Sequence, residues 1–473
     1  MSFYWYDFET FGADPFRDRP AQFAGIRTDE NFNPIGDPLV IYCKPANDML
    51  PQPEACLITG ITPQLAALKG VCEAEFIGRI HQEFAQPGTC VVGYNSIRFD
   101  DEVTRNCLYR NFYDPYAREW QNGNSRWDII DMVRLTRALR PEGICWPEHP
   151  DGRPSFKLEQ LTEANNIEHS AAHDALSDVW ATIAMAKLIR DRQPKLYDYV
   201  YRHRDKHVLE QQLNLRAQKP VLHISSKYSS EKGCAAVVVP LARDKVNKNA
   251  IYVYDLNVDP TPLLNLTAEQ VRDRIFTAAD QLPAGVARIP LKAVHLNKCP
   301  VVVPVNLVTP EIAAKLGIDI DRCLQNLEEI KHNKGLEQKV ADAFAQPFPE
   351  VCDPDLMLYS GGFFSHRDRQ LMEQLRNMAP EQLVEYAPVT DDPRIPEMLF
   401  RYRARNFPET LSETEREEWD EFRRIRLTQP DGGGSITLPV YREQIAALRA
   451  DTTLGAEARR ILGELDAYGQ TVL

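Results

Sequence analysis

Short apolar runs rich in β-branched and aromatic residues mark the start of the chain, and a helical spacing of apolar residues becomes dominant later. Runs bounded by Gly, Pro and Asn predict strands at 3–9, 22–28 and 38–43, with a further strand at 89–93. Strands followed by helices indicate a mixed sheet covered by helices, so we expect an α/β domain over residues 1–192. Apolar residues at helical spacing predict helices at 63–69, 74–85, 101–110, 126–139, 157–165 and 174–191.

A proline at position 194 ends the first domain, because proline stops a helix. The pattern then changes to short β-type runs, which predict a small β-barrel with inserted helices over residues 194–348. From 350 to 473 the pattern is mainly helical, and we expect a helical C-terminal domain there. The segment 429–435 (QPDGGGS) is the clearest loop signal. The β-type runs are 221–226, 235–241, 250–256 and 301–307.

Composition narrows the class of protein. The 473 residues are 43% hydrophobic and 26% charged, which is typical of a globular protein. No stretch approaches the roughly 20 apolar residues of a membrane helix, and Asp7 and Glu9 make the N-terminus unlike a signal peptide. The ten cysteines are scattered, without a C-x-x-C pair, which excludes a zinc ribbon and favours reduced thiols. We therefore expect a cytoplasmic protein with no membrane partner.

The charge of the chain is unevenly distributed. The net charge of −13 argues against a general nucleic-acid-binding surface. Between Lys187 and Lys298, however, 19 Lys and Arg residues face only 11 Asp and Glu residues. An acidic protein with a basic middle is typical of a channel for a polyanion, because local phosphate contacts outweigh long-range repulsion. Ordinary charge fluctuation explains the same numbers equally well.

Acidic residues that could bind a metal ion or take part in catalysis occur in three places. Asp7 and Glu9 alternate along the first predicted strand and therefore face the same side. Two adjacent acids repel each other, so they are either solvated at a strand end or neutralised by a hard cation such as Mg²⁺. Asp100 and Asp101 follow an apolar strand and open a helix, where at least one fits the role of an N-cap.

The third place is H-x4-D at the start of the helix predicted at 174–191. Five positions along a helix put two side chains about 140° apart, so His173 and Asp178 face one site only if His173 lies at or before the first turn. Together the three places supply four carboxylates and a titratable base. A phosphodiesterase that holds two metal ions about 4 Å apart and activates water needs such a set.

The order D-x-E, F-D and H-x4-D is similar to the histidine-bearing DEDD exonucleases of the RNase H-like superfamily. Segments outside these motifs resemble, more narrowly, the bacterial exonuclease I family. The resemblance implies an RNase H-like nuclease domain, a Src-homology-3-like barrel and a C-terminal helical domain. It also implies a processive 3′→5′ exonuclease on single-stranded DNA that releases 5′-mononucleotides and uses two Mg²⁺ ions, with Mn²⁺ as a possible substitute. The similar segments are 7–29, 42–64, 93–106, 111–116, 167–187, 294–300 and 402–411.

The resemblance assigns roles to individual residues. It implies Asp7, Glu9 and Asp178 as direct metal ligands, Asp100 as a metal-site carboxylate that acts through water, and His173 as the general base. We interpret Asp101 as the helix cap. Basic groups and aromatic rings hold single strands, and the resemblance implies substrate contacts at Glu9, Arg105, Tyr116, Trp120, Arg134, Lys157, Lys206, Phe276, Asn297, Lys331 and Tyr359.

The resemblance further implies association with the single-stranded-DNA-binding protein, a monomeric state, and roles in DNA repair and recombination. An oligoribonuclease or a proofreading nuclease would not account for the residues after 192. A non-catalytic single-stranded-DNA-binding scaffold remains the alternative from another class. The sequence has no G-x4-G-K-[ST], H-E-x-x-H or G-x-S-x-G motif, so a P-loop ATPase, a zinc hydrolase and a serine hydrolase lack support.

Overall fold

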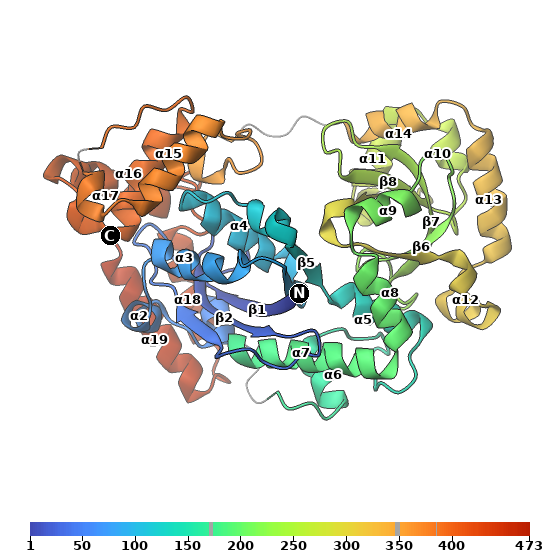
Figure 1. Cartoon of the computed structure of the whole chain (residues 1–473), viewed down its shortest axis with the longest axis horizontal. Coiled ribbons are helices and arrows are strands. Elements are labelled where there is room, and N and C mark those ends of the chain that lie inside the picture. The colour runs from blue at the N-terminus through green and yellow to red at the C-terminus, as the bar shows by residue number, and fades with distance from the viewer. Residues whose placement is uncertain (170–173, 346–350, 385) are drawn as a thin grey trace. The chain divides into compact units, whose positions relative to one another are not determined.

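A computed structural model of the chain describes residues 1–169, 174–345, 351–384 and 386–473 (Figure 1). The chain forms two compact units. Unit 1 comprises Met1–Arg126, His169–Ile183 and Pro349–Leu473, and unit 2 comprises Trp127–Glu168 and Ala184–Phe348. Among the described residues, every helix is too short or too polar to cross a bilayer.

The N-terminal part of the chain forms a five-stranded mixed sheet, with the strand order β3-β2-β1-β4-β5. The central strand β1 runs antiparallel to β2 and parallel to β4, and β2 runs antiparallel to β3. The predicted mixed sheet is confirmed. One boundary was wrong: residues 126–128 were expected to be helical and instead belong to β5, because pairing at the sheet edge outweighs the helical pattern that follows. The strands are β1 (Ser2–Thr10), β2 (Pro20–Thr28), β3 (Leu39–Tyr42), β4 (Thr89–Gly93) and β5 (Ser125–Asp128).

Helices α3 (Glu73–Phe84) and α4 (Asp100–Arg110) cover one face of this sheet. Tyr6 and Phe8 of β1 share a buried apolar cluster with Phe76 of α3 and Val103 of α4. Because strand side chains alternate, Asp7 and Glu9 face the opposite side of the sheet. The other helices close to the sheet in unit 1 are α1 (Pro53–Thr59), α2 (Pro63–Lys69) and the start of α7 (Ala175–Arg192).

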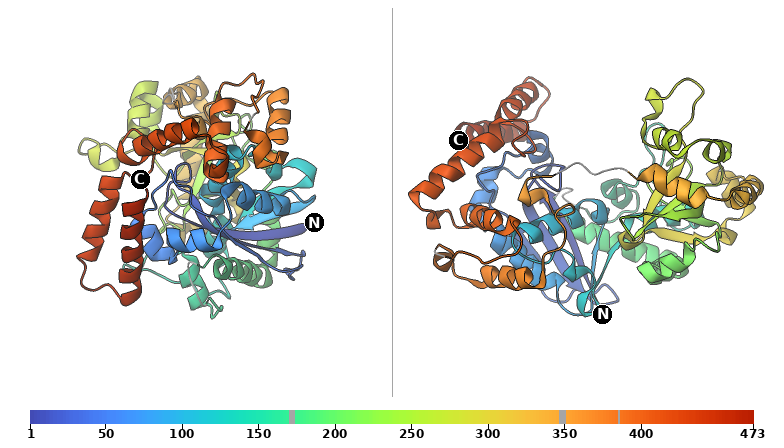
Figure 2. Two further views of the ribbon diagram at one scale, coloured as in Figure 1. Left: turned by 90° about the vertical axis from the view of Figure 1, so that its left-hand side faces the viewer. Right: turned by 90° about the horizontal axis from the view of Figure 1, so that it is seen from above.

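The C-terminal part of unit 1 is helical, as predicted. Tyr441 and Leu465, from its last two helices, pack against Cys56 of α1 and Ile61 in one buried cluster. The red helices α18 and α19 accordingly lie beside the blue N-terminal elements in each view of Figures 1 and 2. The helices of this part are α15 (His366–Asn377), α16 (Arg394–Asn406), α17 (Glu413–Thr428), α18 (Leu438–Arg449) and α19 (Ala456–Thr471).

Unit 2 contains a second five-stranded sheet, in the order β10-β6-β7-β8-β9, with every neighbouring pair antiparallel. The expected small β-domain with inserted helices is thereby confirmed. Strand β9 (Leu291–His295) was not predicted, since its five residues include Lys292 and His295 and lack a continuous apolar run. The other strands are β6 (Val221–Ile224), β7 (Ala235–Arg243), β8 (Ala250–Asp255) and β10 (Val301–Pro304).

Helices occupy the remainder of unit 2. Ala236 and Val238 of β7 and Val253 of β8 form its buried core together with Leu209 and Leu213. The helices are α5 (Ile130–Leu139), α6 (Leu158–Ala164), α8 (Pro194–Arg202), α9 (Lys206–Gln212), α10 (Thr261–Asn265), α11 (Ala268–Phe276), α12 (Pro310–Leu316), α13 (Ile320–His332) and α14 (Leu336–Phe344).

Candidate active site

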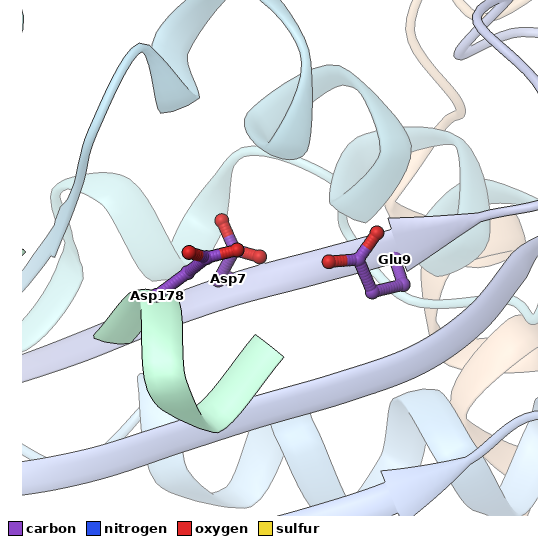
Figure 3. Close-up of side chains that lie close together, drawn as sticks. All are labelled: Asp7, Glu9 and Asp178. Carbon is purple, nitrogen blue, oxygen red and sulfur yellow. The ribbon is translucent and has the colours of Figure 1, made fainter. Parts of the chain in front are cut away.

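Three acids gather beside the central strand of unit 1. Asp7 and Glu9 project from the same face of β1, and Asp178 comes from the first turn of α7 (Figure 3). Each offers a carboxylate oxygen, and these three oxygens all lie within 4.8 Å of one another. The structure thus brings together the three residues that the sequence predicts as metal ligands, although Asp178 is far from the other two along the chain.

The electrostatics of this cluster favour a bound cation. Burial raises the pKa of the Asp7 carboxyl well above its usual range, and the charges of Asp100, Glu9 and Asp178 raise it further. Burial and the charge of Asp178 raise the pKa of Glu9 to about 8. The donors are all carboxylate oxygens, which hard divalent ions such as Mg²⁺ prefer. A divalent cation fits this set, because it would offset the mutual repulsion of the acids.

Asp100 joins the site from a third element. It is the first residue of α4 and is buried. Its Oδ1 accepts a hydrogen bond of 3.2 Å from the backbone N–H of Phe8, the residue between Asp7 and Glu9. Its charge is also among the causes that raise the pKa values of both those acids. Asp100 therefore adds a fourth carboxylate next to the three-acid cluster.

The interpretation of Asp101 as a helix cap was wrong. Helix α4 begins after Phe99 without any side-chain cap, and the Asp101 carboxylate instead accepts hydrogen bonds from two arginines, Arg118 and Arg126. Burial alone would raise the pKa of Asp101, but the charges of Arg126 and Arg118 outweigh it and hold the pKa well below the usual range. The arginines lie 17 and 25 residues away in the sequence, so no local pattern predicted the contacts.

His173, the predicted general base, lies outside the described residues. A different histidine of the same segment contacts the site: Nε2 of His169 lies 2.6 Å from Oδ1 of Asp178. The sequence analysis did not assign His169. Its place in the segment IEHSAAHDALSD, before the start of α7, was the only signal that could have suggested it.

Three of the predicted DNA contacts lie together in unit 1. The Arg105 guanidinium carbon lies 5.3 Å from the ring centroid of Tyr116, and Nη1 of Arg105 donates a 3.0 Å hydrogen bond to the hydroxyl of Tyr359. Arg105 itself is buried and pairs with Glu102 and Glu119 at 3.1 and 2.7 Å. Of the other two candidates of this unit, Glu9 belongs to the acid cluster and Trp120 is 65% exposed.

Two aromatic residues that the sequence analysis did not assign extend this group. The ring centroid of Phe16 lies 6.2 Å from that of Tyr359, and that of Phe363 lies 6.3 Å from that of Tyr116. Phe363 is 87% exposed, which is unusual for a phenylalanine. We call Phe16, Tyr116, Tyr359 and Phe363 the aromatic cluster. The run GGFF at 361–364 was the signal available in the sequence.

The other predicted DNA contacts lie in unit 2, on separate elements. Arg134 is buried on α5 and pairs with Asp131 at 2.5 Å. Phe276, the last residue of α11, is 53% exposed and its ring centroid lies 5.6 Å from that of Phe344. The remaining four are Lys157 before α6, Lys206 at the start of α9, Asn297 between β9 and β10, and Lys331 near the end of α13.

The fold and the site define an exonuclease, and family models agree. The model described as "Exonuclease" matches residues 4–186, which contain the sheet and the acid cluster. The models of the "Exonuclease I SH3-like domain" and the "Exonuclease I C-terminal domain" match residues 204–346 and 352–472.

Relatives are similar over nearly the whole chain. Exodeoxyribonuclease I of Escherichia coli (strain K12) is 52% identical over 429 residues, 90% of each chain. The chain belongs to the exodeoxyribonuclease I family. A solved structure of E. coli Exonuclease I in complex with a dA16 oligonucleotide covers 100% of both chains, with a TM-score of 0.95 and 48% identity.

Two further solved structures are as similar in fold. The Exonuclease I of Methylocaldum szegediense is 57% identical, with a TM-score of 0.96 over 100% of this chain and 99% of that one. A structure of SSB/Exonuclease I in complex with inhibitor CFAM is 47% identical, with a TM-score of 0.92 over 100% and 99% of the two chains. These relatives support the predicted fold class and enzyme class.

Proposed function

We propose that the chain degrades single-stranded DNA from its 3′ end, releases 5′-mononucleotides, and needs two Mg²⁺ ions. The observation that carries the proposal is the convergence of Asp7, Glu9 and Asp178 to within 4.8 Å. The dA16 complex of the E. coli relative supports single-stranded DNA as the substrate. The complete acid set argues against the alternative, a non-catalytic scaffold that binds single strands.

The positions of the acids support the roles that the resemblance assigns to them. Asp7, Glu9 and Asp178 would hold the metal, and Asp100 would act through water from its place beside Phe8. When bound, the ions supply a water that is nucleophilic at neutral pH and stabilise charge on the phosphate and the leaving 3′-oxygen. His173, by family resemblance, accepts the proton of that water, since the ordinary pKa of histidine lies near the working pH.

The three expected domains, 1–192, 194–348 and 350–473, form part of this proposal. Candidate contacts for the strand occur in both compact units, and the two exposed rings of the aromatic cluster, those of Tyr359 and Phe363, suit stacking with bases. A strand held at many points dissociates slowly, so we expect processive digestion. The SSB/Exonuclease I structure supports the single-stranded-DNA-binding protein as a partner, and family membership supports a cytoplasmic monomer that acts in DNA repair and recombination.

The experiment compares matched 20-nucleotide DNA and RNA substrates with a blocked 3′ or 5′ end, in Mg²⁺ and in EDTA. We expect rapid, Mg²⁺-dependent digestion of DNA with a free 3′ end. Asp7→Ala should abolish cleavage and keep DNA binding, whereas Asp37→Ala, an exposed acid outside the site, should leave both unchanged. Equal digestion of RNA or of 3′-blocked DNA, or wild-type turnover by Asp7→Ala, would exclude the proposal.

A further inference from the structure

A buried ion-pair cluster surrounds Asp101, the residue that follows Asp100 in the chain. Oδ1 of Asp101 accepts hydrogen bonds from Nη2 of Arg118 at 2.5 Å and from the hydroxyl of Tyr6 at 3.0 Å. Its Oδ2 accepts one from Nη1 of Arg126 at 2.7 Å. We call these four residues, Tyr6, Asp101, Arg118 and Arg126, the Asp101 clamp.

The clamp fastens three segments of unit 1 to one carboxylate. Tyr6 lies on β1, Asp101 in the first turn of α4, Arg118 in the 3₁₀ helix Ala117–Glu119 and Arg126 on β5. The side chains of Asp101 and Arg118 are 2% and 0% exposed, and that of Arg126 is 6% exposed. Since water scarcely reaches these groups, the ion pairs are only weakly screened, and both oxygens of Asp101 are occupied.

Asp100 and Asp101 are adjacent, but their carboxylates have different partners. Asp101 contacts two arginines, whereas Asp100 accepts a hydrogen bond from the backbone N–H of Phe8, between the proposed metal ligands Asp7 and Glu9. The position of Asp100 therefore depends on how the start of helix α4 is held. The first turn of a helix has few backbone hydrogen bonds of its own. Helix α4 has no side-chain cap at this end either.

The clamp restrains this end of the helix. Two hydrogen bonds join β1 to the first turn of α4, one from Tyr6 to Asp101 and one from the backbone of Phe8 to Asp100. Tyr6 and Phe8 flank Asp7 in the sequence. The strand that carries the metal ligands is therefore tied to the helix that carries Asp100, on both sides of Asp7.

We infer that the Asp101 clamp is a positioning device that holds the Asp100 carboxylate at the metal site, beside Asp7 and Glu9. Asp101, Arg118 and Arg126 are thus positioning residues for the reaction, not only part of the core. The inference rests on the proposed nuclease function. It requires that substitutions in the clamp reduce turnover through Asp100, beyond any loss of stability.

The first test is Asp101→Asn, which keeps the size of the side chain and removes its charge. Substitution of such outer residues typically lowers metal affinity or activity by about 10- to 100-fold, and we expect a fall of this size in kcat, with a higher Mg²⁺ concentration for half-maximal rate. The Kd for single-stranded DNA in EDTA should stay within about twofold of wild type, because the clamp does not reach solvent. Tyr6→Phe removes only one hydrogen bond and should lower kcat by about two- to fivefold.

The matched control is Glu73→Gln. Glu73 pairs with Arg110 at 3.0 Å near the other end of α4, and the pair is comparably buried. This substitution should lower the melting temperature as Asp101→Asn does but leave kcat and the Mg²⁺ dependence within about twofold of wild type, since the site is not involved.

A double-mutant cycle with Asp100→Asn decides the mechanism. If the clamp acts through Asp100, Asp101→Asn should cost less than about twofold in kcat once Asp100 is already Asn. An equal loss in both backgrounds, or wild-type kcat in both Asp101→Asn and Tyr6→Phe, would overturn the inference. If Asp101→Asn does not fold, Tyr6→Phe and its cycle with Asp100→Asn carry the test alone. A wild-type chain that degrades no DNA in Mg²⁺ would instead refute the proposed function.

Discussion

Nε2 of His169 lies 2.6 Å from Oδ1 of Asp178, and the histidine side chain is only 5% exposed. A hydrogen bond to one oxygen of a metal-binding carboxylate fixes the direction of the other. We therefore expect His169→Asn to weaken Mg²⁺ activation by about 10- to 100-fold, as for other outer-shell partners of metal ligands.

The measurement is the Mg²⁺ concentration at half-maximal rate on a single-stranded oligonucleotide. His366→Asn, at an exposed histidine at the start of α15, is the control and should leave that concentration unchanged. Identical Mg²⁺ curves for His169→Asn and wild type would show that the contact with Asp178 has no role in metal binding.

The acid cluster makes the stability of the metal-free protein depend on pH. The pKa of Glu9 is raised from 4.5 to about 8, and that of Asp7 is raised as well, so the folded chain keeps protons that the unfolded chain releases. Stability from these groups is fully present below about pH 4.5 and is lost as the pH rises through about 8. Metal-free protein should therefore melt at a lower temperature at pH 8.5 than at pH 6.5. Addition of Mg²⁺ should raise the melting temperature more at pH 8.5 than at pH 6.5.

Asp7→Asn isolates this effect, because the variant has one acid fewer in the cluster. In thermal melts in EDTA, the melting temperature of the variant should rise relative to that of wild type as the pH rises. The nuclease activity of the variant should be lost. A difference in melting temperature that does not change between pH 6.5 and 8.5 would contradict the assigned repulsion.

Asp48 joins the C-terminal helices to the nuclease sheet within unit 1. Its Oδ2 accepts hydrogen bonds from Nε and Nη2 of Arg405 at 3.1 and 2.8 Å, and Arg19 and Arg426 lie within 3.9 and 3.4 Å. The Asp48 side chain is fully buried. Asp48→Asn leaves three buried arginines without this partner, and removal of one member of a buried pair typically destabilises by about 3–5 kcal/mol.

Chemical denaturation followed by circular dichroism measures this loss. The control is Glu457→Gln, which breaks the exposed Arg460–Glu457 pair of α19 and should leave the midpoint unchanged, since surface pairs contribute little. Equal midpoints for Asp48→Asn and wild type would refute a stabilising role for the network.

Helix α19 contains two glycines whose substitution by alanine should change the stability of the protein in opposite directions. A Cβ at Gly463 would meet no atom within 4 Å, so Gly463→Ala should stabilise by about 0.5–1 kcal/mol through the higher helix propensity of alanine. A Cβ at Gly469 would lie 2.7 Å from Cε1 of Tyr441. The hydroxyl of Tyr441 donates to the carbonyl of Leu465 at 2.7 Å, which keeps the ring in place. Gly469→Ala should therefore destabilise by about 1–3 kcal/mol, and melts of both variants test the pair.

The sequence predicts the fold best where periodicity is strong. The strands at 3–9, 22–28 and 89–93 and the helix at 63–69 recur in the structure with nearly the same bounds. The short strands β5 and β9 were missed, because four or five residues carry little pattern of their own. Both are strands through pairing with β4 and β8, which only the assembled sheet provides.

The candidate site likewise divides into residues that the sequence predicts and contacts that only the structure reveals. Strand alternation alone placed Asp7 and Glu9 on one face, and the motif order singled out Asp178 and Asp100. Asp101 was wrongly predicted to be a cap, because local rules favour an acid at a helix start in that role. Its partners Arg118 and Arg126 are 17 and 25 residues distant, and their approach depends on how the chain returns to the sheet.

By itself, the sequence determined the periodic elements, the class of chemistry and the acids that could carry it, because these follow from residue types and short-range spacing. The tertiary structure alone decided that three carboxylate oxygens lie within 4.8 Å of one another, that His169 reaches Asp178, and that two arginines hold Asp101. The reason is physical: contacts between segments distant along the chain depend on packing of the whole core, which no local pattern encodes.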